Sequence, residues 1–115
     1  MARAATTLDA FNAIAEPQRR KILTLLRGNE RSVNDLANDL GLSQSSASKH
    51  LKVLREVGLV RSRDSGQQRL YCLDARGLKP VHAWTSGFEQ FWSGSFNRLN
   101  DYVIELSRQE KSRGK

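Results

Sequence analysis

A run of short hydroxyl and amide side chains, followed by lysines, occupies residues 43–52, "SQSSASKHLK". Serine donates and accepts hydrogen bonds without bulk, glutamine can pair with an adenine edge, and lysine can reach guanine or phosphate. A helix that begins here also presents free N–H groups and the positive end of its dipole to an anion. These residue types in this order favour a surface that binds nucleic acid. The alternative is that they are only cap and solvent-exposed residues of a helix.

The apolar residues of the same stretch predict the helix and its orientation. Ala47, Leu51 and Leu54 follow one another at spacings of four and three, which is typical of a buried helix face. Ser43 is placed to cap its start, and Gly58 is placed to end it. This phase turns five polar residues outward: Gln44, Ser45, Ser48, Lys49 and Lys52.

The residues on either side predict a winged helix-turn-helix. Another helix precedes, with Ser32 as its cap and Gly41 at its end, so residues 32–57 form two helices joined by a short glycine turn. Two alternating stretches, 59–63 and 69–73, flank a turn at 64–67 and predict a β-hairpin, the wing.

The predicted wing is basic. Arg61, Arg63 and Arg69 stand near its turn, with Gln67 and Gln68 between them. A wing that carries arginine beside a groove-reading helix can follow the DNA backbone or enter a minor groove. The alternative is an exposed hairpin with solubilising charge, which the adjacent polar helix makes less attractive.

Length and charge agree with a small nucleic-acid-binding protein. The chain has 115 residues, which predicts one domain over 1–115, with a tail at 107–115. Lys and Arg number 19 against 12 Asp and Glu, so a polyanion is the expected partner, either nucleic acid or an anionic membrane surface. A single cysteine, Cys72, allows no internal disulfide and fits a reducing, cytoplasmic location. No apolar run is long enough to span a membrane.

The rest of the chain predicts a mainly α fold with one small hairpin. Helices are expected near 8–15 and from Pro17 onward, and a long dimerisation helix is expected over about 79–106. The aromatic stripe on that last helix is too large for a small domain to bury alone, so we expect it to form a shared dimer core. Gly87 and Gly94, seven residues apart, allow a close helix approach, a groove for a ligand, or a helix break. The predicted interface residues are Phe88, Phe91, Trp92, Leu99 and Tyr102.

Patterns for catalysis, metal binding or a cofactor are missing. The segment "WSGSF" lacks the Gly-x-Ser-x-Gly elbow, and neither a P-loop nor a dinucleotide glycine pattern occurs. A metal site needs three or four converging donors, and the chain offers one cysteine and two histidines. We therefore expect no enzyme activity, no metal and no cofactor, and we interpret Cys72 as an inert cysteine rather than a redox switch.

The motif "LSQSSASKHLKVLREVGLV", followed by a basic hairpin and "YCL", resembles the ArsR-type winged-helix repressors over about residues 10–106. The resemblance implies a bacterial or archaeal homodimer that binds operator DNA and leaves it when a signal binds. It also implies that Gln44, Ser45, Ser48 and Lys49 contact DNA from the helix. In the wing, it implies that Arg63, Gln67 and Arg69 contact DNA. Metal sensors of this family carry Cys-x-Cys on the first helix of the motif, or Asp and His pairs on the last helix. Here the first helix of the motif reads "NDLANDL", without cysteine. The expected last helix carries His82 and no second histidine.

The expected function is sequence-specific DNA binding by a homodimeric transcriptional repressor. Two recognition helices about 34 Å apart would read a partially palindromic operator through the major groove. An unknown small-molecule effector is compatible with this function. A rival from another class is a protein-assembly module that uses the winged-helix fold and the aromatic helix. A third, an RNA-binding winged helix, lacks exposed aromatic residues near the wing. Salt-dependent retention on random DNA would separate the first two.

Overall fold

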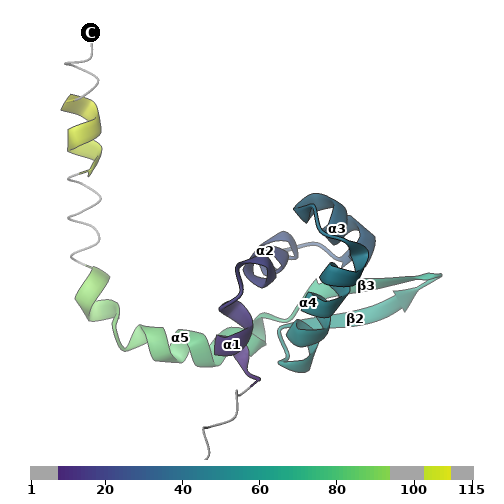
Figure 1. Ribbon diagram of the computed structural model, residues 1–115. Coiled ribbons are helices and arrows are strands. Elements are labelled where there is room, and N and C mark those ends of the chain that lie inside the picture. Colours follow the sequence, from purple (N-terminus) through teal and green to yellow (C-terminus); the bar gives the residue numbers. More distant parts are fainter. Residues whose placement is uncertain (1–7, 94–102, 110–115) are drawn as a thin grey trace, which may run out of the picture. The chain divides into compact units, whose positions relative to one another are not determined.

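The computed structural model describes residues 8–93 and 103–109 (Figure 1). The chain divides into two units, Met1–Val81 and His82–Lys115. The first unit contains the helix-turn-helix and the sheet. The expectation of a single domain over the whole chain stays a prediction.

Two short helices open the first unit, α1 (Ala10–Ile14) and α2 (Pro17–Leu25). Glu16 caps α2, because its Oε1 accepts a hydrogen bond from the Gln18 amide at 2.9 Å. Arginines of α2 reach back to the last carbonyls of α1: Arg19 Nε donates to the Ala13 oxygen at 2.7 Å, and Arg20 Nη1 donates to the Ile14 oxygen at 2.6 Å. The guanidinium groups therefore satisfy carbonyls that a helix end leaves without partners.

The helix-turn-helix comprises α3 (Val33–Leu40) and α4 (Gln44–Glu56), and it confirms the predicted motif. Ser32 Oγ accepts from the Asp35 amide at 3.1 Å, and Ser43 Oγ accepts from the Ser46 amide at 3.0 Å, so both predicted serine caps are present. Gly41 has φ +68°, the left-handed conformation that glycine adopts readily and that here ends α3. The sequence between the helices thus dictates the corner.

The wing belongs to a three-stranded antiparallel sheet, in the order β1-β3-β2. Its strands are β1 (Arg31–Ser32), β2 (Val60–Ser65) and β3 (Gln68–Leu73). The predicted hairpin is confirmed, but its turn is shorter than expected, because Ser65 pairs with Gln68 and only Gly66 and Gln67 connect the strands. The sequence prediction missed β1, which has only two residues and so carries no alternating pattern of its own.

The core of the first unit lies where the helices meet the sheet. The predicted inner residues Ala47, Leu51 and Leu54 are fully buried, and α4 packs against α3 and β2. Figure 1 shows α4 crossing the base of the hairpin, whose strands extend away from it. This packing fixes the orientation of α4 and therefore of its outer, polar face.

The 3₁₀ helix η1 (Ala75–Leu78) follows the wing and packs closely on the residues that precede β2. A Cβ added to Gly77 would lie 2.8 Å from Leu59 Cδ2 and even closer to the backbone oxygen of Gly58. Only glycine fits this approach. Residues Leu78 and Val81 then pack against the core cluster.

The prediction of a single long helix over 79–106 is wrong in part, because the helix is interrupted. Helix α5 spans Lys79–Ser86, Gly87 and Phe88 form a turn, and residues 89–93 are helical again. Gly87 lowers helix stability by about 1 kcal/mol relative to alanine. The Ser86 hydroxyl also donates to the Ala83 carbonyl at 2.9 Å, a side-chain bond that competes with the helical pattern. Of the three roles left open for Gly87, the structure therefore shows the helix break. Gly94 lies outside the described residues.

Candidate nucleic-acid interface

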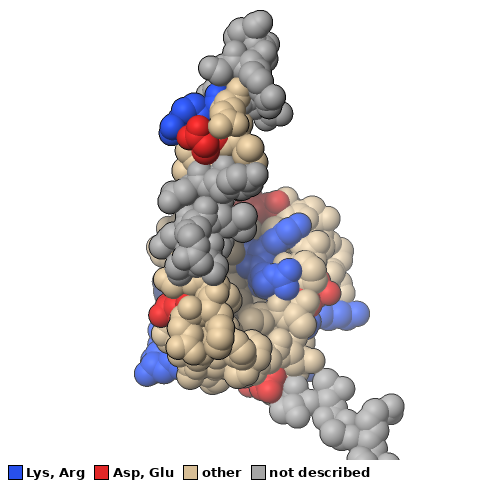
Figure 2. All heavy atoms as spheres, turned by 90° about the vertical axis from the view of Figure 1, so that its left-hand side faces the viewer, with Lys and Arg blue, Asp and Glu red and all other residues tan. Residues whose placement is uncertain are grey.

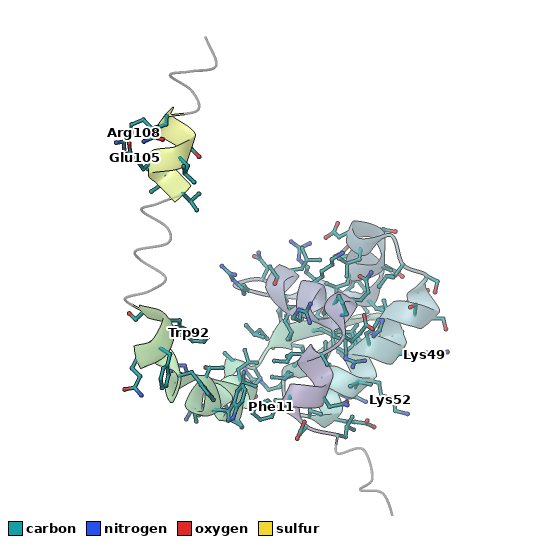
Figure 3. The ribbon with its side chains drawn as sticks, turned by 60° about the vertical axis from the view of Figure 1, so that its left-hand side comes forward. Phe11, Lys49, Lys52, Trp92, Glu105 and Arg108 are labelled. Atoms are coloured by element: carbon teal, nitrogen blue, oxygen red, sulfur yellow. The ribbon has the colours of Figure 1, made fainter. Side chains whose placement is uncertain are left out.

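The outer face of α4 carries the residues predicted to read DNA. All five are exposed, since they alternate with the buried positions of the helix. Figure 3 shows Lys49 and Lys52 pointing away from the body of the first unit. Within the described part of the chain, neither lysine has an acidic group within 4.0 Å. The predicted helix residues are Gln44, Ser45, Ser48, Lys49 and Lys52.

The start of α4 is suited to an anion. Ser43 caps the helix by accepting from the Ser46 amide, and this leaves the first amides of the helix pointing outward. Aligned peptide dipoles place partial positive charge at this end. The small side chains of Ser45 and Ser48 leave room for a phosphate or a base edge to approach the backbone, so the local sequence matches a docking end.

The wing arginines lie on different faces of the hairpin. Directly paired residues of an antiparallel ladder share a face, and successive residues alternate. Arg63 pairs with Leu70, whereas Arg69 pairs with Asp64, the next residue along β2. The structure therefore does not bring Arg63 and Arg69 together on one face. Gln67 is exposed in the turn.

Arg63 makes a two-pronged ion pair with Glu30, a residue 33 positions earlier. Arg63 Nε donates to Glu30 Oε2 and Nη2 donates to Oε1, each at 2.8 Å. This hydrogen bonding holds the pKa of the Glu30 carboxyl below its ordinary value and raises the pKa of Arg63. Since the depressed pKa belongs to an acid, the pair is present at neutral pH and is lost only when acid protonates Glu30.

The other wing arginines also have acidic neighbours. Arg69 Nε lies 3.4 Å from Asp64 Oδ1, and hydrogen bonding to that carboxylate raises the pKa of Arg69. Arg61 Nε lies 3.7 Å from Asp74, and Asp74 is also bound by Arg76 at 3.0 Å. The net positive charge of the wing is therefore smaller than a count of its arginines indicates.

Two residues of this region were not among the predicted site residues. Arg55, in the last turn of α4, lies with its Nη1 3.5 Å from Ser62 Oγ on β2, between α4 and the wing. Glu30 is the second, through its contact with Arg63. Arg55 follows Lys49 and Lys52 at a spacing of three residues, and this basic spacing could have pointed to it, whereas no local signal marks Glu30.

On one face of the molecule the positive charge is not gathered in a single patch. On the face drawn in Figure 2, Lys and Arg project from the described residues as separate blue areas, and Asp and Glu form smaller red ones. Several cations of the first unit have structural partners, as Arg19 and Arg20 do. The lysines of α4 are consequently the clearest free cations at the predicted interface.

The second unit exposes aromatic side chains that were predicted to form a dimer interface. Phe91 is 67% exposed and Trp92 is 49% exposed. Phe88 is also exposed and makes an edge contact with Trp84, at 5.0 Å between ring centroids. Figure 3 shows where Trp92 projects from this segment. The other two predicted interface residues, Leu99 and Tyr102, lie outside the described residues.

The described ranges contain neither a cluster of metal ligands nor a membrane-spanning helix. In residues 8–93 and 103–109, no three His, Cys, Asp or Glu side chains come together in a way that could hold a metal ion. None of the helices in these ranges combines the length and apolar character that crossing a membrane requires.

The fold and the polar face of α4 define a winged helix-turn-helix protein of the DNA-binding type. Residues 16–62 match the family model described as "Bacterial regulatory protein, arsR family". The chain belongs to the ArsR family, and it is a DNA-binding transcriptional regulator rather than an enzyme.

Similar proteins extend the match beyond the motif. The transcriptional repressor SdpR of Bacillus subtilis (strain 168) is 34% identical over 80 residues, which cover 70% of this chain and 89% of SdpR. The transcriptional activator HlyU of Vibrio cholerae serotype O1 is 41% identical over 62% of this chain and 66% of its own length. A crystal structure of a possible transcriptional regulator for arsenical resistance superposes with a TM-score of 0.64, at 41% identity, over 83% of this chain and 96% of that one.

Proposed function

We propose that this protein is a homodimeric repressor that binds a partially palindromic operator in the bacterial cytoplasm. The observation that carries the proposal is the face of α4, where Gln44, Ser45 and Ser48 stand beside two lysines with no acidic neighbour among the described residues. Small hydrogen-bonding side chains suit base edges, and free lysines suit phosphate. α4 enters the major groove, and the wing follows the adjacent backbone.

The proposed roles differ along the interface. Gln44 and Ser48 read base edges, while Lys49 and Lys52 bind phosphate and set the register of the helix. Gln67 at the wing tip and the wing arginines, Arg63 and Arg69, approach the backbone beyond the major groove. Arg63 and Arg69 do so from opposite faces of the hairpin, so they bind different phosphates.

Dimerisation is supported by the exposed aromatic side chains of the second unit. Phe88, Phe91 and Trp92 would be a liability on a monomer, because large exposed apolar surface favours association. A second copy of this chain is the proposed occupant, with Leu99 and Tyr102 continuing the same interface. Twofold symmetry then places two copies of α4 about 34 Å apart, one turn of DNA.

Repression is the sign of regulation that we propose, by analogy with SdpR, which is named a repressor. HlyU is named an activator, so the same kind of binding domain serves either outcome. The sign depends on where the operator lies relative to the promoter, and a dimer that covers a promoter blocks it. A small-molecule effector that releases the dimer is part of the proposal, and its identity is open.

The proposal is tested by selecting bound sites from random DNA and then titrating the protein with the most enriched duplex. The selected sites are expected to share two inverted half-sites, centred 10–10.5 base pairs apart or a multiple of this spacing. Sedimentation of the complex should give two chains per duplex. Selection that enriches no shared sequence would instead support a protein-assembly module, and enrichment of a single half-site would contradict the dimer.

A further inference from the structure

Glu30 holds the wing arginine from across the sheet. Arg63 stands on β2 and Glu30 comes directly before β1, so the central strand β3 lies between them. Neighbouring strands are about 4.8 Å apart. The Arg63 side chain therefore extends over β3 to reach the carboxylate, and it ends in two hydrogen bonds of 2.8 Å.

This geometry resembles the way in which a guanidinium binds a phosphate. Arginine recognises carboxylate and phosphate alike, through a pair of parallel N–H groups. Glu30 occupies Nε and Nη2, the pair that a phosphate would use. Both side chains remain open to solvent, with Arg63 59% exposed and Glu30 36% exposed. An incoming phosphate can therefore reach the arginine without unfolding any element.

We propose that Glu30 is an intramolecular competitor for the DNA phosphate at Arg63, and that Arg63 exchanges the carboxylate for a phosphate when the wing meets DNA. This inference rests on the proposed function, because it requires the wing to lie at the DNA. In the free protein the pair neutralises the charge of Arg63 and holds its side chain toward Glu30. Because Glu30 competes with phosphate, it lowers the affinity of the protein for every DNA sequence. The exchange takes place only after binding through α4 has brought the wing near the DNA backbone.

The test compares binding of a labelled random-sequence duplex and of the selected operator at 50, 100 and 200 mM salt. The variants are Glu30→Gln, Arg63→Ala and the double variant. Asp39→Asn is the matched control: Asp39 forms an exposed ion pair of the same 2.8 Å length with Arg31, and its substitution changes net charge equally. Thermal unfolding of each variant confirms that the fold is retained.

Glu30→Gln is expected to tighten binding to both duplexes by about two- to fivefold, the range expected when an exposed ion pair no longer has to be exchanged. Its plot of log affinity against log salt should steepen by up to about 0.9, the slope of one phosphate contact, because Arg63 no longer has to break an ion pair in order to bind the phosphate. In the Arg63→Ala background, Glu30→Gln should have no effect beyond that of Asp39→Asn.

Three results would contradict the proposal that Glu30 competes with DNA phosphate for Arg63. The first is weaker binding by Glu30→Gln, which would mean that Glu30 positions Arg63 for DNA. The second is an equal gain in Glu30→Gln and Asp39→Asn, which would reduce the effect to net charge. The third is that Glu30→Gln and Arg63→Ala both bind the operator with the affinity of the wild type, which would mean that Arg63 does not contact DNA. Wild-type protein that binds no DNA would refute the proposed function itself.

Discussion

Replacing Lys49 and Lys52 together by alanine is expected to change the salt dependence of DNA binding without changing the fold. Both side chains are exposed on α4, and neither has an acid within 4.0 Å among the described residues. Each phosphate contact contributes about 0.9 to the slope of log affinity against log salt, so losing two lowers the slope by about 1.8. Alanine is the strongest helix former, so α4 should remain intact.

The size of the effect follows from this slope. A slope lower by about 1.8 means that, between 50 and 200 mM salt, the wild-type protein should lose about tenfold more affinity than the double variant. Fluorescence anisotropy with a labelled operator at four salt concentrations measures this. Lys21→Ala, the same change on the exposed part of α2, is the control and should keep the wild-type slope. Identical slopes for the wild type and the double variant would show that Lys49 and Lys52 do not contact phosphate.

Three further variants test other parts of the molecule. Ser48→Ala should reduce discrimination between operator and random DNA by about 0.5–1.5 kcal/mol, the contribution of one hydrogen bond, and a loss of thermal stability with specificity retained would show that Ser48 acts in the fold instead. Gly77→Ala should destabilise the fold by about 1–3 kcal/mol in urea titration, because its Cβ would press on Gly58 and Leu59; an unchanged midpoint would contradict the close approach. Trp92→Ala should raise the dimer dissociation constant in sedimentation and weaken operator binding together, while a folded variant that remains dimeric would place the interface elsewhere.

Local signals allowed the helix-turn-helix to be predicted almost in full. A serine cap depends on the residue and the amide three positions later, so Ser32 and Ser43 could be recognised from the sequence alone. The spacing of Ala47, Leu51 and Leu54 likewise fixed the face of α4 that is buried, and with it the face that is exposed. These features involve residues close together in the chain.

Features that depend on strand register could not be predicted in the same way. The contact between Glu30 and Arg63 spans 33 positions and exists only because β1, too short to show a pattern, lies beside β3. The opposite faces of Arg63 and Arg69 follow from the strand register, in which Arg63 pairs with Leu70 and Arg69 pairs with Asp64. The break in the last helix was one of several roles open to Gly87, because a glycine lowers helix stability without fixing the structure that replaces the helix.

The capping of α1 by Arg19 and Arg20 has a chemical consequence for the whole molecule. Every ion pair found in the described residues is made by an arginine, and none is made by a lysine. Guanidinium groups thus hold elements together, while the ammonium groups of α4 remain available to solvent. Acetylation removes the charge of a lysine and leaves arginine unchanged. An amine-acetylating reagent would therefore discharge the recognition helix while the contacts that maintain the fold stayed in place, and bound DNA would shield Lys49 and Lys52 from the reagent.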